Sequence, residues 1–233
     1  EKTAFTQYLK CKYFRNKAKQ SQGGSISLSN TNKAEVSNTS FNNNSAFTNG
    51  GALSILYSKE IILCACNYVN NIARQSGGAI HINKCLQTSH YYCYFTENIA
   101  KNGGSIFISY TINSTLSNTY FTKNIASSNG GAVVLLFCKL IQYFESINAL
   151  NEAKLHGGSN FHKNCITVHY RECTFKGNLA LSGSAIYAEY FEKFLQAKCN
   201  FLNNFAHRFS GTTKFHVGIT FRDNCSMYIS NQA

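Results

Sequence analysis

The chain of 233 residues has 22 Lys and Arg against 10 Asp and Glu, which gives a formal net charge of +12 at pH 7. Only one of the acidic residues is an Asp, so we do not expect the carboxylate clusters that calcium cages and paired-acid hydrolases require. A hydrophobic fraction of 44% excludes a disordered tail, and the longest apolar run, residues 132–138, is too short to span a membrane.

The first 20 residues carry a cluster of basic side chains, namely Lys2, Lys10, Lys12, Arg15, Lys17 and Lys19. Such a run binds anionic glycans or an acidic partner surface, or it only solvates one end of the molecule. In an extracellular compartment a glycan is the expected partner, and we expect no nucleic acid.

A repeat of 26 or 27 residues organises the chain from about residue 14 to residue 224. A pair of glycines marks each unit, at Gly23-Gly24, Gly50-Gly51, Gly77-Gly78, Gly103-Gly104, Gly130-Gly131 and Gly157-Gly158, with Gly183-Ser184 as a seventh copy. A second motif, an aromatic residue followed three positions later by Asn, keeps the same period. Phe14 and Lys17 mark its start, and Asn148 with Asn151 forms a degenerate copy.

Each unit contains short strands, because apolar and polar side chains alternate after each glycine pair. Several short strands with Gly and Asn at the corners, repeated from unit to unit, describe one coil of a parallel β-helix. We therefore predict an all-β fold, a single β-helix domain over residues 1–233 with eight to nine coils of 26–27 residues. Equivalent residues should stack about 4.8 Å apart in a rod about 40 Å long.

The second motif predicts two interior columns. The aromatic stack should comprise Phe41, Tyr68, Phe95, Phe121, Phe175, Phe201 and Phe221. The corner ladder should comprise Asn44, Asn71, Asn98, Asn124, Asn178, Asn204 and Asn224. Stacked amides can bond to one another and to backbone groups that turn away from the sheet.

The linked G-G-[AS]-[ILV] and F-x-x-N motifs resemble the repeats of the chlamydial polymorphic membrane protein family, and similar repeats occur in large surface proteins of protists. The resemblance covers about residues 14–224. It implies a right-handed parallel β-helix of the pectin-lyase-like kind, exposed at the cell surface and used in adhesion. The GGAL, GGAI and GGAV blocks and the F-x-x-N blocks are the equivalent elements.

The ten cysteines show no spacing of a zinc site, so we expect no metal and no cofactor. Two groups of them share a position in the repeat, where other coils have Thr or Ser. Neighbouring coils lie within disulfide range, so the candidate bonds are Cys66 to Cys93, Cys138 to Cys165 and Cys173 to Cys199. The alternative is a column of unlinked, buried thiols. Cysteine-rich chains favour an oxidising compartment, so the predicted localisation is extracellular or at the cell surface.

Four glycosylation sequons, at Asn38, Asn43, Asn113 and Asn224, agree with secretion. We expect glycans on Asn43 and Asn113 ahead of Asn224, because a corner Asn should point inward.

Residues 137–156 depart from the repeat and contain apolar spacings of a short helix. The segment is either a helical excursion or a degenerate coil, and its unchanged length favours the coil.

Two functions remain open. A carbohydrate-active β-helix enzyme acting on acidic polysaccharide needs clustered carboxylates, and only Glu145 with Glu172 and Glu189 with Glu192 come close. A non-catalytic structural or adhesive protein needs none, and we favour it. Both ends of the chain still have strand patterns, so we expect further coils of a longer chain, or the next copy in a filament, to cover them.

Overall fold

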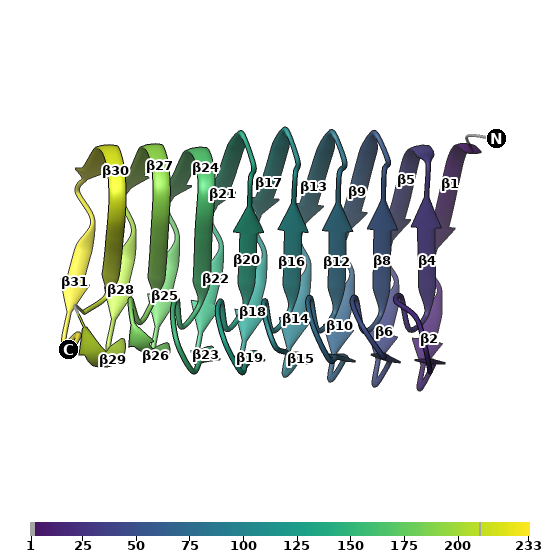
Figure 1. Ribbon diagram of the computed structural model, residues 1–233, viewed down its shortest axis with the longest axis horizontal. Coiled ribbons are helices and arrows are strands. Elements are labelled where there is room, and N and C mark those ends of the chain that lie inside the picture. The colour runs from purple at the N-terminus through teal and green to yellow at the C-terminus, as the bar shows by residue number, and fades with distance from the viewer. Residues whose placement is uncertain (1–2, 210) are drawn as a thin grey trace.

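The structure, a computed structural model, describes residues 3–209 and 211–233. These residues form parallel β-strands and no helix, and the chain winds about eight times around one axis (Figure 1). The predicted parallel β-helix is confirmed. The described part of the chain therefore offers no helix that is long and apolar enough to cross a membrane.

The largest sheet has 14 strands and forms two faces of the coil. The first face consists of β4 (Ile26–Ser29), β8 (Leu53–Leu56), β12 (Ile80–Asn83), β16 (Ile106–Ser109) and β20 (Val133–Leu136). The second face consists of β1 (Thr3–Leu9), β5 (Thr31–Ser37), β9 (Glu60–Cys64), β13 (Gln87–Tyr91), β17 (Asn113–Ser117) and β21 (Leu140–Phe144). In the last three coils one long strand runs through both faces, as β24 (Asn160–Arg171), β27 (Ile186–Ala197) and β30 (Thr213–Asn224).

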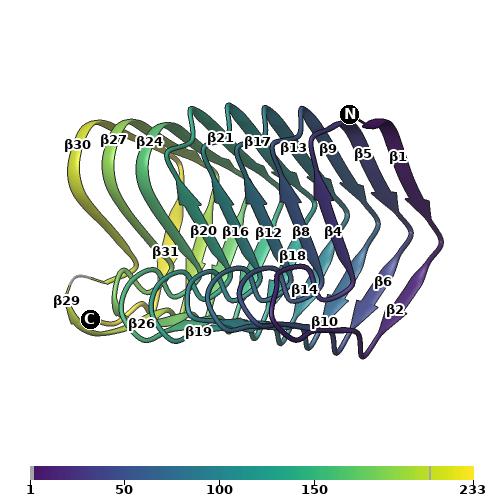
Figure 2. The ribbon, with the colours of Figure 1, turned by 45° about the vertical axis from the view of Figure 1, so that its right-hand side comes forward.

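Two smaller sheets close the coil (Figure 2). The third face has nine strands, β2 (Lys12–Phe14), β6 (Ser40–Asn42), β10 (Asn67–Val69), β14 (Tyr94–Thr96), β18 (Tyr120–Thr122), β22 (Ile147–Ala149), β25 (Thr174–Lys176), β28 (Asn200–Leu202) and β31 (Met227–Ile229). The narrow face has eight, β3 (Lys17–Ala18), β7 (Ser45–Ala46), β11 (Ile72–Ala73), β15 (Ile99–Ala100), β19 (Ile125–Ala126), β23 (Glu152–Ala153), β26 (Leu179–Ser182) and β29 (Phe205–Phe209).

The strands pair in register, so one coil repeats the inside-outside pattern of the next. On the first face Leu53 pairs with Ile80, and Ile55 pairs with Ile82; all four side chains are fully buried. The middle residue of each third-face strand also points inward. The core is therefore a set of columns that run along the rod, each built from one position of the repeat.

The chain turns four times in each coil, and one residue at each turn has a left-handed backbone. Apart from Gly177, three of the turns use residues other than glycine, and within the described residues φ lies between 48° and 58° at 25 such positions. These include Tyr57, Tyr110 and Phe137, large residues that rarely adopt this conformation. The stacked coils on both sides hold the backbone in this conformation, although it is locally unfavourable.

The glycine pair occupies the fourth turn, and its two members are needed for different reasons. The first glycine is left-handed, as at Gly50 with φ of 60°, and a Cβ there would clash with the carbonyl of Leu53. At the second, Gly51, a Cβ would clash with the carbonyl of Gly78 in the next coil. At both positions a Cβ would therefore collide with backbone atoms.

Residues 137–156 form a regular coil, with β21, β22 and β23 in their usual places. Leu140 and Phe144 pair with Thr167 and Arg171 in the next coil. The degenerate-coil interpretation is therefore the one that the structure supports. The apolar spacings that suggested a helix come from alternation on a strand followed by a turn.

Candidate functional site: interior columns and the open end coils

A ladder of asparagines runs through the interior at the turn between the third and the narrow faces. Each Asn side chain is fully buried at Asn44, Asn71, Asn98, Asn124, Asn178 and Asn204. The Nδ2 of Asn71 donates to Oδ1 of Asn98 at 3.0 Å and to the carbonyl of Phe41 at 2.9 Å. The backbone N–H of Asn71 donates to the same Oδ1 at 2.9 Å. The amide of Asn71 therefore satisfies two backbone groups of the preceding coil, since its Oδ1 accepts from the Asn44 N–H and its Nδ2 donates to the Phe41 carbonyl.

The ladder also contains three asparagines outside the predicted set. Asn16 donates to Asn44, Asn151 connects Asn124 to Asn178, and Asn204 donates to Asn231. Asn151 belongs to the copy that sequence analysis classed as degenerate. Asn231 stands where Asn224 was expected.

The prediction for the last copy, Phe221 and Asn224, is wrong. Phe221 lies in β30 and pairs with Phe194, and the side chain of Asn224 is exposed. Tyr228 instead stacks on Phe201, with ring centroids 4.7 Å apart. The step from Phe201 to Tyr228 keeps the period of 27, whereas Phe221 breaks it, so the period was the signal that could have found the correct pair.

The first copy is displaced by one residue from Phe14 and Lys17. Tyr13 stacks on Phe41 with centroids 5.0 Å apart, and Asn16 enters the ladder. Phe14 and Lys17 are exposed. Accepting Tyr at the aromatic position, as Tyr68 already requires, would have found Tyr13 and Asn16.

The aromatic stack runs unbroken from Tyr13 through Phe41, Tyr68, Phe95 and Phe121, with centroids 4.8 to 5.0 Å apart. It resumes at Phe175 and Phe201, which stack at 5.0 Å. Parallel rings in register give the core a rigid, continuous column.

Asn148 interrupts this stack, and aromatic side chains from the second face fill the space. Tyr143 and Tyr170 stack with centroids 4.3 Å apart. Asn160 Nδ2 donates to the Tyr170 hydroxyl at 2.8 Å, and His162 Nε2 lies 2.6 Å from that oxygen. Burial lowers the pKa of His162 to about 3, so the ring is neutral at pH 7. A buried polar network therefore replaces one ring of the stack.

The cysteine columns exist, but the structure holds all ten cysteines as free thiols. The structure therefore does not show the expected disulfides among Cys66, Cys93, Cys138, Cys165, Cys173 and Cys199, and it matches the alternative of unlinked thiols. Each column residue follows a left-handed one and donates to the carbonyl two positions back. Cys93 Sγ lies 3.3 Å from the Tyr91 carbonyl, and in the next coil Thr119 Oγ1 lies 3.1 Å from that of Ser117. Thiol and hydroxyl therefore have the same role as a donor.

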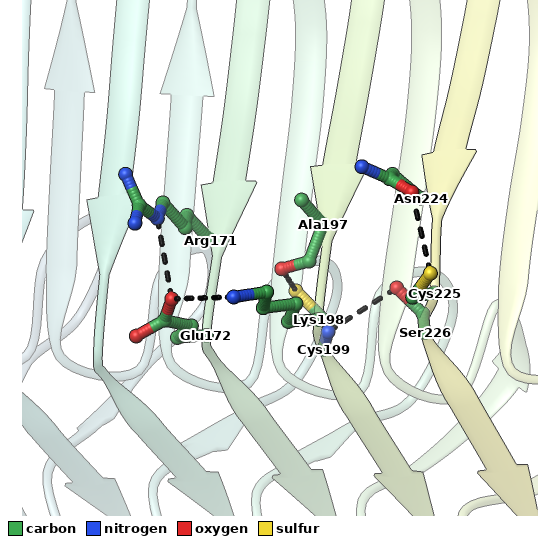
Figure 3. Close-up of polar contacts among 8 residues, drawn as sticks. All are labelled: Arg171, Glu172, Ala197, Lys198, Cys199, Asn224, Cys225 and Ser226. Carbon is green, nitrogen blue, oxygen red and sulfur yellow. Dashed lines mark hydrogen bonds and ion pairs between the residues drawn. The ribbon is translucent and has the colours of Figure 1, made fainter.

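Burial keeps several of these thiols protonated. It raises the pKa of Cys85 to about 11 and that of Cys93 and Cys173 well above the usual value. Figure 3 shows the column near the C-terminus, where Cys199 Sγ donates to the Ala197 carbonyl at 3.4 Å. The backbone N–H of Cys199 donates to Ser226 Oγ at 3.2 Å in the next coil.

The carboxylates that an enzyme would need are engaged or dispersed. Glu145 and Glu172 both occupy the left-handed turn after the second face. Glu172 Oε1 lies 3.3 Å from Arg171 Nε and 3.8 Å from Lys198 Nζ (Figure 3). Glu189 pairs with Lys163 at 2.6 Å, and Glu192 is exposed. Among the described residues, no three His, Cys, Asp or Glu side chains gather as metal ligands would.

The sequon asparagines Asn38, Asn43, Asn113 and Asn224 are all exposed. The expectation that Asn224 points inward is therefore wrong, because it is not part of the ladder. In the N-terminal segment Lys10, Lys12, Arg15, Lys17 and Lys19 are exposed, and Lys2 lies outside the described residues.

Both end coils leave strand edges open. Among the described residues, β1, β2, β3 and β4 pair on one side only at one end, and β30 and β31 do so at the other. The outer edge of β29 is partly covered, because Phe205 bridges Gln232. Apolar side chains are exposed there, for example Phe5 at 50%, Ile219 at 80% and Met227 at 50%. An open parallel edge with apolar side chains is a template for another strand.

The two ends are also complementary, because the asparagine ladder has a direction. Each amide donates to the next Asn toward the C-terminus. Within the described residues, Asn16 Oδ1 therefore receives no hydrogen bond, and Asn231 has no further Asn to which it can donate. Tyr13 and Tyr228 likewise each have a single stacking partner in their column. Head-to-tail contact would continue both columns, whereas head-to-head contact would place acceptor against acceptor.

A family model described as the Chlamydia polymorphic membrane protein repeat matches residues 118–135. The matched segment contains one F-x-x-N block, at Phe121 and Asn124, and the glycine pair Gly130-Gly131. The resemblance of the repeats is therefore confirmed. Comparison with curated proteins and with solved structures gives no match.

Proposed function

We propose that this parallel β-helix is a non-catalytic, extracellular structural and adhesive protein that assembles end to end. The observation that carries the proposal is the complementarity of the two open ends. The edge of β30 and β31 offers unpaired strand and the donor end of the ladder, and the edge of β1 and β2 offers unpaired strand and the acceptor end.

Stacking through such edges repeats the contact that already joins every pair of coils. In the 233-residue chain the next coil would come from another copy, and in a longer chain it would come from flanking repeats. Contact between two different surfaces does not close on itself, so repeated association yields a filament. A filament of this kind suits a surface layer, and the likeness to the chlamydial repeats supports a location at the cell surface.

A non-catalytic role is supported by the state of the carboxylates. Glu172 lies between two cations, which occupy the oxygen that a substrate would need. A zymogram on polygalacturonate tests this part of the proposal. We expect no turnover; turnover that disappears in Glu145→Gln or Glu172→Gln would establish the carbohydrate-active alternative.

The exposed asparagines Asn43 and Asn113 are the proposed glycosylation sites. Peptide mapping of the protein from a eukaryotic secretory host should find glycans there. Their complete absence after secretion would contradict this proposal.

Sedimentation velocity over a concentration series tests the assembly itself. The wild-type chain of 25.9 kDa should shift to larger species as its concentration rises. In Asn231→Asp a carboxylate would face the Asn16 acceptor of the next copy, so association should weaken by about tenfold or more. Asn67→Asp adds the same charge at an exposed mid-rod position and should associate like wild type. Equal behaviour of Asn231→Asp and wild type would rule out contact through these ends.

A further inference from the structure

The narrow face carries a concentration of positive charge that the assembly does not use. Along its strands and the residues that follow them lie six basic side chains, Lys17, Lys19, Arg74, Lys101, Lys154 and Arg208. The same segments contain one acid, Glu152, so their formal charge is six minus one, or +5, out of +12 for the chain. In Figure 1 this face forms the lower edge of the rod, from β3 to β29.

Four of these cations stand in one line because of the repeat. The second residue of each narrow-face strand is an Ala that points inward, and these alanines pair from coil to coil, as Ala46 does with Ala73. The next residue is exposed in every coil from β3 to β23, and it is Lys19, Phe47, Arg74, Lys101, Ser127 and Lys154 in turn. We call this line the basic stripe. At about 4.8 Å per coil it extends about 24 Å along the rod from Lys19 to Lys154.

The basic stripe begins in a groove. The groove has a volume of about 360 Å³ and is lined by Lys17, Lys19, Ser45, Phe47, Ile72 and Arg74, with Ala18 and Ala46 at its base. The Arg74 guanidinium lies 4.5 Å above the Phe47 ring, which is 45% exposed. Among the described residues, none of the stripe cations has a carboxylate within ion-pair distance, whereas Lys33, Lys123 and Lys163 elsewhere each have one.

Apolar side chains run beside the cations. Ile72, Ile99 and Ile125 pair in register in the adjacent line and are 47%, 41% and 40% exposed. A ligand for this surface must therefore be negatively charged at regular intervals, have apolar patches between the charges, and be straight over several coils. A polysaccharide with carboxylate or sulfate groups has all three properties, since its ring C–H faces can lie against Ile and Phe while its anions meet Lys and Arg.

We propose that the basic stripe binds a linear anionic polysaccharide along the rod axis, with the groove at Arg74 and Phe47 as its anchor. This names the ligand class of the proposed adhesive function and rests on that function for its biological role, but one unassembled chain suffices for binding. A groove lined by Lys17, Lys19 and Arg74 suits an anionic chain that lies in it. A membrane surface would instead need apolar side chains that protrude beyond the cations.

Titration with size-fractionated heparin oligosaccharides, and separately with polygalacturonate fragments, tests the proposal at concentrations below assembly. We expect affinity to rise with oligosaccharide length up to about 24 Å and to fall as salt is added, because bound counterions are released. Binding of only the sulfated or only the carboxylated series would identify the anion.

The deciding variant is Lys19→Ala with Arg74→Ala and Lys101→Ala. It should lose about tenfold or more in affinity and show a shallower salt dependence. The matched control, Lys59→Ala with Lys139→Ala and Lys193→Ala, removes the same charge from exposed positions off the stripe and should retain most of the affinity. Equal losses in the two variants would reduce the effect to net charge and overturn the proposal, as would the absence of binding.

Two further measurements distinguish glycan binding from end-to-end assembly and from membrane binding. Sedimentation without glycan should be the same for the stripe variant and wild type, so a failure of assembly and a failure of glycan binding can be told apart. The second measurement is the binding of the protein to vesicles that contain 30% phosphatidylserine. Stronger binding to the vesicles than to every oligosaccharide would overturn the polysaccharide proposal in favour of a membrane surface.

Discussion

A single corner asparagine satisfies several buried groups at once, and Asn98 is a clear case. Its Oδ1 accepts from the backbone N–H and the Nδ2 of Asn71, and its own Nδ2 donates to the Tyr68 carbonyl at 3.0 Å. Its Nδ2 also donates to Asn124 Oδ1 at 3.1 Å, so in Asn98→Ala four buried groups would lose a partner. We therefore expect the free energy of unfolding to fall by at least about 3 kcal/mol. Chemical denaturation measures this. Asn67→Ala, an exposed control on β10, should change stability little, and equal effects of the two would contradict the role of the ladder.

The cysteine columns predict a contrast between two substitutions of equal size. Cys93 Sγ donates to the Tyr91 carbonyl, as the Thr119 hydroxyl does to Ser117 in the next coil. Cys93→Thr keeps a donor and should fold with near wild-type stability. Cys93→Val removes the donor and should cost about 0.5–1.5 kcal/mol more, since the Tyr91 carbonyl keeps its bond from the Ala65 N–H but loses the one from the side chain. If valine is tolerated as well as threonine in thermal unfolding, the column is merely a packing position.

Three buried histidines predict acid sensitivity. Burial lowers the pKa of His81 and His90 to about 4 and that of His162 to about 3, below the ordinary 6.5. At acidic pH these histidines therefore bind protons in the unfolded chain before they do so in the folded chain. The stability that depends on these neutral histidines is fully present above about pH 6.5 and is lost as the pH drops toward 4. Below pH 4, His81 and His90 cause no further loss.

The variant His90→Leu tests whether a buried neutral histidine makes stability fall as the pH drops. The neighbouring coils have Leu63 and Leu116 at the same position, so the replacement fits the column. Between pH 7 and pH 4 the wild type should lose about 3 kcal/mol more than the variant, from a pKa difference of about 2.5. Equal pH profiles of the unfolding free energy would show that His90 does not titrate as described.

The sequence could predict those residues whose role repeats in every coil. The Phe41 and Asn44 columns followed from their period. Residues whose role depends on one coil could not be predicted, because Tyr143, Tyr170 and His162 fill a gap that exists only where Asn148 replaces a ring. The last copy could be misplaced because Phe221 and Asn224 match the motif by chance, although they break the period of the repeat.

At the scale of the coil, glycine is needed at the fourth turn because the neighbouring backbone leaves no room for a Cβ. A Cβ on Gly78 would clash with the Gly104 carbonyl and with Ile99 in the next coil, both of them backbone atoms. Gly78→Ala should therefore destabilise the protein by about 3 kcal/mol or more, the upper end of overpacking costs. Gly211→Ala is the matched control, because its Cβ would meet only Ala233, at 4.0 Å. Equal midpoints of thermal unfolding for the two variants would contradict this account.

The arrangement of strands within a coil was only partly predictable. Alternation after each glycine pair indicated the first face correctly, with Ile80 and Ile82 inward. Besides Asn, the other turns carry Tyr, Lys or Glu in a left-handed conformation, and these three residue types give no turn signal in sequence. Their positions follow from the stacking of coils, which fixes the backbone whatever the side chain.

At the scale of the whole molecule, the repeat makes a rod with a direction. Neighbouring strands are parallel, and each ladder amide donates to the next one toward the C-terminus. The two ends of the rod therefore differ and complement each other. The basic stripe follows the same axis, and end-to-end assembly would continue it from copy to copy. Adhesion through such a surface gains from many weak contacts along one ligand.

Cryo-electron microscopy of the concentrated wild-type chain tests the central claim, head-to-tail assembly, most directly. The account predicts filaments with an axial subunit repeat of about 40 Å and a stacking of about 4.8 Å that continues across the junction between copies. The β31 edge of one copy should meet the β2 edge of the next. Single 25.9 kDa particles at every concentration, or pairs joined through like ends, would contradict it.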